Sequence, residues 1–276
     1  MSASSSSKPL VRRVYSRVEM NVVQSARIFA HVAAAHQPGA TVEEHLVATR
    51  DGRPVDLQEI QAPNRGRLHK LVCPPGRVVL EYSATVTGLA DPIPVDPFDE
   101  ALYLRPSRYA ESDELLAKAY EEFSGLSSPR AILDTVTAWV WSHLKYVPGS
   151  SGPTDGASQT MLHREGVCRD YAHLTTALLR ALDVPARVVG VYAPGISPMD
   201  FHAVCEALVD GQWVIVDTSR LGPRQSMLRM TTGRDAADTA FLSTYGGYVE
   251  LESIEIRAIV DGGLPVDDHQ GIVALR

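Results

Sequence analysis

The sequence predicts an α+β protein in which a small antiparallel β domain precedes a domain of helices packed on an antiparallel sheet. Apolar and polar residues alternate before residue 90, helical spacing follows, and short apolar runs with turn signals begin near residue 186. The expected limits are 1–9 for a disordered N-terminus, 10–90 for the β domain, 91–100 for a linker and 101–276 for the second domain.

The β domain is expected to consist of short strands joined by tight turns. Residues 14–20 and 78–86 alternate in polarity, which is typical of half-buried strands. The run Arg-Asp-Gly-Arg at 50–53 has the composition of a hairpin turn. The proline-rich run 91–97 disfavours regular structure and is therefore the natural linker.

Three helices are expected in the second domain. The first covers Asp113–Phe123, and the second begins after Ser128, a good N-cap that is followed by proline. Its apolar residues recur at helical spacing as far as Leu144. The third helix begins at Cys168 and ends before Pro185.

Strands should follow the helices at Ala186–Tyr192, Ala203–Val209, Gln212–Asp217 and Tyr248–Val260. Asp210-Gly211 is a signal for a two-residue type I′ hairpin. In such a hairpin the numbers of opposing residues have a constant sum, so Val204 should lie opposite Asp217. This register brings Asp217 close to His202.

Composition excludes few function classes. Of 276 residues, 45% are hydrophobic and 21% charged, and the net charge of −7 argues mildly against a nucleic-acid or anionic-membrane partner. Three cysteines without paired spacing make a disulfide framework unlikely to form, and the N-terminal serine run does not resemble a secretory signal. We therefore expect a cytoplasmic protein without membrane or nucleic-acid partners; the sequence does not indicate its oligomeric state.

Cys168 is the main candidate for a reactive residue, because it follows a glycine-containing turn and begins the third expected helix. The helix dipole and the unpaired backbone N–H groups there favour the thiolate, which is the form that attacks. His202 begins one predicted strand and Asp217 ends the next. Each residue alone has a commoner structural role, but together they form a nucleophile, a base and an orienting carboxylate.

The sequence resembles the bacterial transglutaminase-like proteins. The resemblance includes the β domain and nearly the whole chain, with matching blocks at 103–109, 166–173, 178–189, 201–204, 216–218 and 233–238. It implies a papain-like fold with Cys168 as nucleophile, His202 as base and Asp217 as orienter. The chain departs from the family pattern at Val204, where an aromatic residue is common, and at Thr218, where proline is common.

Four other residues are weaker candidates. Gln159 or Tyr146 could join the Cys168 backbone N–H in an oxyanion hole. Asp170 and His173 could touch substrate, although Asp170 also suits a helix N-terminus and His173 also suits the core.

A metal site is the less favoured alternative. Cys168, His163, His173 and His202 are of ligand type, but the chain has no CxxC or HxxxH pair among them. We therefore expect neither a metal nor another cofactor.

The expected substrate is a peptide or protein amide, which includes glutamine side chains. The sequence leaves open whether water or an amine resolves the acyl-enzyme, and so whether the outcome is hydrolysis or transfer. A dedicated cysteine peptidase or amidase is one alternative. A binding module that keeps the fold without turnover is another.

Overall fold

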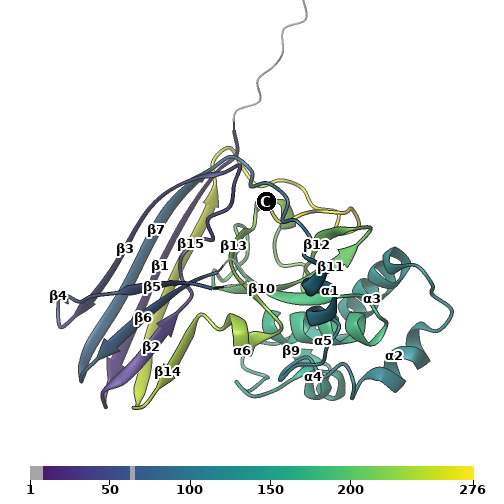
Figure 1. Cartoon of the computed structure of the whole chain (residues 1–276), viewed down its shortest axis with the longest axis horizontal. Coiled ribbons are helices and arrows are strands. Elements are labelled where there is room, and N and C mark those ends of the chain that lie inside the picture. Colours follow the sequence, from purple (N-terminus) through teal and green to yellow (C-terminus); the bar gives the residue numbers. More distant parts are fainter. Residues whose placement is uncertain (1–8, 63–65) are drawn as a thin grey trace, which may run out of the picture.

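The structure is a computed structural model that describes residues 9–62 and 66–276. One lobe contains two β-sheets, and the other contains the helices, a four-stranded sheet and the short β8–β9 pair (Figure 1). The predicted fold class is confirmed: helices pack on an antiparallel sheet, and an all-β part precedes them in the chain. The disordered N-terminus expected at 1–9 lies, apart from Pro9, outside the described residues.

The β lobe combines a five-stranded sheet, ordered β15-β1-β7-β3-β4, with a four-stranded sheet, ordered β14-β2-β6-β5. Alternate residues of β1 and β7 are buried in the core between the sheets, as the alternating pattern predicts. The strands are β1 (Val11–Val22), β2 (Ala26–Ala30), β3 (Thr41–Arg50), β4 (Arg53–Pro54), β5 (Gln58–Gln61), β6 (Arg67–Cys73), β7 (Gly76–Thr87), β14 (Leu242–Tyr245) and β15 (Val249–Val260).

The structure corrects the expected linker at 91–100. Helix α1 (Pro97–Tyr103) begins inside it, because Asp96 accepts a hydrogen bond from the Phe98 N–H and Pro97 occupies the first helical position. Proline is tolerated there, since the first N–H groups of a helix have no partner within it. Pro97, which the sequence analysis assigned to a linker, thus marks the start of a helix.

The last two strands lie in the β lobe, which the sequence analysis did not predict. The strand expected at Tyr248–Val260 exists as β15, but it pairs with β1, and β14 pairs with β2. Alternating polarity identifies the buried face of a strand and leaves its partner unspecified. The domain limits 10–90 and 101–276 stay a prediction. Strands β14 and β15, within residues 242–260, pair with strands of the first segment.

The helical lobe is built on a four-stranded antiparallel sheet, ordered β12-β11-β10-β13. Helix α5 packs on β10 and β11 through a core of leucine, valine and alanine side chains. Helices α4 and α6 were not predicted. The remaining elements are α2 (Leu116–Phe123), α3 (Pro129–His143), β8 (Lys145–Tyr146), α4 (Ala157–His163), β9 (Glu165–Gly166), α5 (Cys168–Ala181), β10 (Ala186–Tyr192), β11 (His202–Val209), β12 (Gln212–Val216), the 3₁₀ turn η1 (Arg224–Ser226), β13 (Leu228–Gly233) and α6 (Ala236–Thr239).

The hairpin between β11 and β12 has the predicted register. Asp210 and Gly211 both have positive φ, 51° and 75°, as a type I′ turn requires. Cys205 lies opposite Val216, in agreement with the expected constant sum. Asp217 immediately follows β12 and therefore emerges beside the start of β11.

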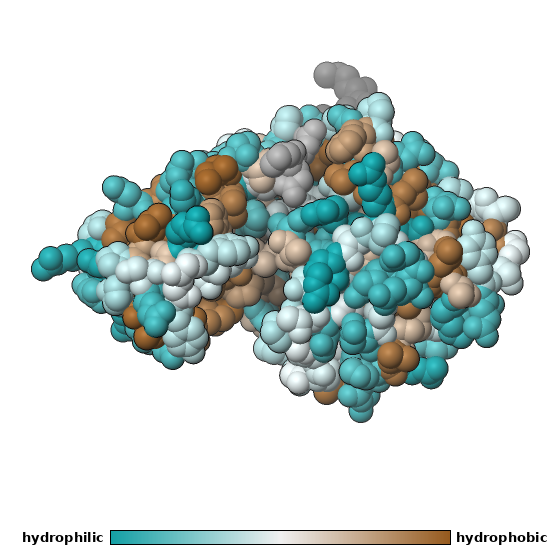
Figure 2. All heavy atoms as spheres, turned by 60° about the horizontal axis from the view of Figure 1, so that its bottom comes forward, coloured by the Kyte–Doolittle hydropathy of each residue, from teal (hydrophilic) through white to brown (hydrophobic). Residues whose placement is uncertain are grey.

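The surface mixes polar and apolar residues over both lobes, which meet at a notch on the face in Figure 2. In the described part of the chain, no helix is both long and apolar enough to cross a bilayer.

Candidate functional site

Cys168 is the first residue of helix α5, as the sequence predicts. The Val167 N–H donates to Asp170 Oδ2 at 2.8 Å, a capping interaction that fixes where the helix begins. The thiol therefore stands at a helix N-terminus, where backbone N–H groups lack partners within the helix. It is half-buried, so a small reagent can reach it.

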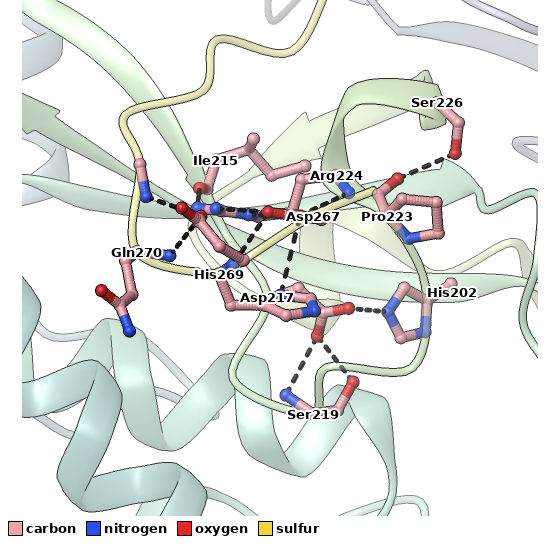
Figure 3. A network of polar contacts seen from close by, with 12 residues as sticks. His202, Ile215, Asp217, Ser219, Pro223, Arg224, Ser226, Asp267, His269 and Gln270 are labelled. Atoms are coloured by element: carbon pink, nitrogen blue, oxygen red, sulfur yellow. Dashed lines mark hydrogen bonds and ion pairs between the residues drawn. The ribbon is translucent and has the colours of Figure 1, made fainter. Parts of the chain in front are cut away.

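His202 and Asp217 meet in the interior of the same lobe. The distance from His202 Nε2 to Asp217 Oδ2 is 3.0 Å, and both side chains are almost fully buried (Figure 3). The Cys168 side chain is close enough to the imidazole to contribute to the raised pKa of His202. Because Nε2 faces Asp217, Nδ1 is the nitrogen available to the thiol. The structure therefore joins two of the three residues singled out by the sequence, and the third, Cys168, lies close enough to influence the pKa of the imidazole.

Asp217 is held by residues that follow it in the chain. Its Oδ1 accepts hydrogen bonds from the Ser219 N–H at 3.0 Å and the Ser219 hydroxyl at 2.6 Å, which leaves Oδ2 for His202 (Figure 3). The Thr218 hydroxyl lies 2.9 Å from that of Thr175 on α5, so this turn is tied to the helix that carries the thiol. Sequence reasoning missed these supports, although Thr-Ser after a strand-ending aspartate is a turn signal.

The buried pair favours its charged form. Burial alone would lower the pKa of His202, but attraction to Asp217, the hydrogen bond to Asp217 and the nearby Cys168 side chain outweigh it and raise that pKa to about 10. Burial alone would raise the pKa of Asp217, but the imidazole and the Ser219 donors lower it. The arrangement therefore stabilises a protonated His202 beside an ionised Asp217. The imidazole of His202 can exchange a proton with the neighbouring thiol.

Tyr146 lies at the thiol. Strand β8 pairs in parallel with β9, and this sets Tyr146 opposite Gly166, two residues before Cys168. Burial and the negative charge of the Cys168 thiolate raise the pKa of the Tyr146 phenol to about 12, and the nearby Cys168 backbone N–H opposes the rise. The phenol therefore stays protonated and can donate a hydrogen bond beside the sulfur.

The structure gives Gln159 and Asp170 structural partners. Gln159 Oε1 accepts from the Gly156 N–H at 3.1 Å and caps helix α4, and no contact joins Gln159 to Cys168 among the described residues. Asp170 is fully buried and caps helix α5, while Arg169 contacts its other oxygen at 3.0 Å.

His173 is fully buried on helix α5. Its Nε2 accepts a hydrogen bond from the Ala236 N–H at 3.1 Å, and its ring stacks on Tyr109. Burial lowers its pKa to about 4, so it is a neutral core residue at neutral pH.

Arg169 anchors the loop before helix α4 to the nucleophile's helix, a role that sequence reasoning did not identify. Its guanidinium donates to the Gly152 carbonyl at 2.7 Å and the Ser151 hydroxyl at 3.1 Å. The two remaining cysteines, Cys73 and Cys205, are buried, as expected for core residues.

The metal alternative finds no support in the described segments, since no group of three or more His, Cys, Asp or Glu side chains there is placed to hold an ion. His163 is exposed at the end of α4. The Nε2 atom of His173 already accepts a hydrogen bond from the Ala236 N–H.

The sequence is similar to that of known proteins. Residues 117–218, which include Cys168, His202 and Asp217, match the sequence model of the “Transglutaminase-like superfamily”. The chain is 29% identical over 168 residues to the uncharacterized protein ML0607 of Mycobacterium leprae (strain TN). That match covers 56% of this chain and 58% of the relative, less than two thirds of its length.

A solved structure extends the likeness to the whole chain. It belongs to a proposed cysteine protease from Cytophaga hutchinsonii, which is 29% identical with a TM-score of 0.84 over 98% of this chain and 96% of that one. Both lobes are therefore shared with that protein. The resemblance predicted from the sequence is confirmed: residues 117–218 match the transglutaminase-like superfamily, and the whole chain shares its fold with the proposed cysteine protease.

Proposed function

We propose that the protein cleaves peptide or glutamine-type amide bonds through a Cys168–His202–Asp217 triad and an acyl-enzyme. The observation that carries the proposal is the buried His202 imidazole, which is hydrogen-bonded to Asp217 and whose pKa the nearby Cys168 side chain helps to raise. The likeness to a proposed cysteine protease supports the same class of chemistry.

The reaction has two halves. The Cys168 thiolate attacks the amide carbonyl carbon, and the tetrahedral intermediate collapses as the C–N bond breaks. His202 donates its proton to the leaving amine, which leaves a thioester on sulfur. Water or an amine then attacks the thioester, His202 removes the proton of the attacking group, and the thiol is released with the acid or the new amide.

The oxyanion of each intermediate needs donors beside the sulfur. We propose the Cys168 backbone N–H and the Tyr146 hydroxyl, since both groups lie at the thiol and the phenol remains protonated. Gln159 is the weaker candidate because its side chain is held at the N-terminus of helix α4 and, among the described residues, has no contact with Cys168.

Thiol alkylation tests the proposal. Iodoacetamide should label Cys168 faster than a free model thiol at neutral pH, because the imidazolium and the helix N-terminus favour the thiolate. Cys168→Ala should abolish this fast labelling, whereas Cys205→Ala should not, since Cys205 is buried. Labelling of Cys168 no faster than the model thiol would favour the binding module.

A panel of peptide and glutamine-containing amides, assayed with and without hydroxylamine, identifies the acyl acceptor. Hydroxamate accumulation indicates an accessible thioester that amines can resolve. Release of free acid alone indicates hydrolysis and favours a dedicated peptidase or amidase.

A further inference from the structure

A pocket of about 340 Å³ lies next to the triad, between helix α3, the end of strand β12 and the C-terminal residues 269–273. Asp217 contributes to its wall. Its volume is in the range of sites for small organic ligands. The proposed amide chemistry at Cys168 does not use this pocket.

Most charges around the pocket are neutralised by partners. Arg130 contacts Asp134 at 2.7 Å and donates to a backbone carbonyl, and Arg224 forms a two-point ion pair with Asp267 at 2.8 Å. His269 faces the same Asp267 carboxylate at 3.6 Å (Figure 3). None of these side chains carries a charge that still requires a partner.

Arg220 differs from the other cations of the pocket. Within residues 9–62 and 66–276, no side-chain hydrogen bond or ion pair compensates its guanidinium, and its buried Nε has no partner. The guanidinium lies over the ring of Trp141, with Cζ 4.8 Å from the ring centroid. Such stacking orients an arginine and leaves its N–H edge free. A buried N–H without an acceptor is costly, so this geometry is set up for an anionic ligand.

The rest of the wall limits the kind of anion. It contains aliphatic side chains from α3, β12 and the C-terminal segment, namely Leu133, Ala138, Val214, Val216, Ile272 and Val273. A carboxylate matches the planar fork of a guanidinium, and a short aliphatic group matches the apolar wall.

We propose that this pocket binds a carboxylate that carries a small aliphatic group, and that Arg220 is its charged partner. The C-terminal residue of a peptide and a free branched-chain carboxylic acid both have this chemistry. The site is separate from the thiol, and its occupancy is measurable without turnover.

Calorimetric titration of the full chain tests the proposal. N-acetyl-leucine should bind with a Kd on the order of 1 mM, as expected for a single charge-assisted contact with some apolar burial. The uncharged N-acetyl-leucine amide should bind at least about tenfold more weakly. Equal affinity for acid and amide, or no binding of the acid, would overturn the proposal.

Variants of Arg220, with one of Arg130 as control, assign the contact. Arg220→Gln should weaken binding of N-acetyl-leucine by about tenfold or more, and Arg220→Lys should restore part of the affinity. Arg130→Gln is the matched control and should change affinity by less than about twofold, because Arg130 is already paired with Asp134. Wild-type affinity in folded Arg220→Gln, checked by circular dichroism, would refute the assignment.

The two sources of carboxylate are separated by a third titration. A tetrapeptide ending in leucine that binds more tightly than 4-methylpentanoate indicates a peptide C-terminus. Tighter binding of the free acid indicates a small metabolite. Either result supports the carboxylate site, and failure of both ligands to bind would contradict it.

Discussion

His202 at the start of β11 and His173 within α5 are both buried, but their surroundings favour opposite protonation states. The pKa of His202 is raised to about 10, and that of His173 is lowered to about 4. Burial acts on both rings in the same direction, so the difference comes from their neighbours.

The neighbours of His173 explain why it stays neutral. The carboxylate of Asp235 is close enough to influence it, but its two oxygens accept hydrogen bonds from the backbone N–H groups of Tyr109 and Ala237. His173 Nε2 in turn accepts from the Ala236 N–H, which requires an unprotonated nitrogen. A carboxylate hydrogen-bonded to a buried ring, as at His202, thus raises the pKa of the ring, and a carboxylate committed to backbone donors does not raise it enough to offset burial.

The largest expected effect is that of Asp217→Asn. Loss of the carboxylate should lower turnover on the order of 10³–10⁴-fold, because His202 loses its orienting partner. Since burial remains, the pKa of His202 should fall, and the alkaline limb of the pH profile of kcat/KM should move to lower pH. Steady-state kinetics from pH 5 to about 10 measures both changes.

Asp200→Asn is the matched control for that variant. Asp200 is two residues before His202, but its Oδ1 accepts from the Phe201 N–H and no hydrogen bond to the imidazole is present. Its kcat/KM should stay within a few-fold of wild type, as for a charge without direct contact. Unchanged turnover in Asp217→Asn would mean that another group orients His202.

Tyr146→Phe should have the next largest effect. Removal of one oxyanion donor should lower kcat by about 10²–10³-fold with little change in KM. Gln159→Ala is the comparison variant. It should lower the free energy of unfolding rather than kcat, because Gln159 caps helix α4. If kcat falls in Gln159→Ala and does not fall in Tyr146→Phe, Gln159 and not Tyr146 is the oxyanion donor.

His173→Gln should have the smallest effect on activity, within about twofold of wild type, because the glutamine oxygen can still accept from the Ala236 N–H. Its effect should appear in the pH dependence of stability. The unfolded state binds a proton near the ordinary pKa and the folded state only near pH 4, so wild type loses stability as pH falls between these values.

Urea unfolding at several pH values between about 6.5 and 4 measures this loss, which is at most about 3 kcal/mol for one group. His173→Gln should flatten that part of the curve. A slope identical to wild type would mean that His173 is not the group that titrates.

The sequence determined the features that depend on local interactions. The start of helix α5 at Cys168 follows from a cap three residues away, and the hairpin register follows from the positive φ of Asp210 and Gly211. These two local elements already bring Asp217 near His202. The three main residues of the site could therefore be named from the sequence.

Only the tertiary structure decided what lies around those residues. Ser219 holds Asp217, a two-residue parallel pair sets Tyr146 opposite Gly166 beside the start of α5, and the Arg220 guanidinium lies over the ring of Trp141. Strand β15 likewise pairs with β1 across most of the chain length. Alternating polarity specifies which face of a strand is buried, but it does not specify which strand or side chain will lie opposite. Strand pairing and the protonation state of a buried group both depend on that neighbour, and the neighbour is brought close only when the chain folds.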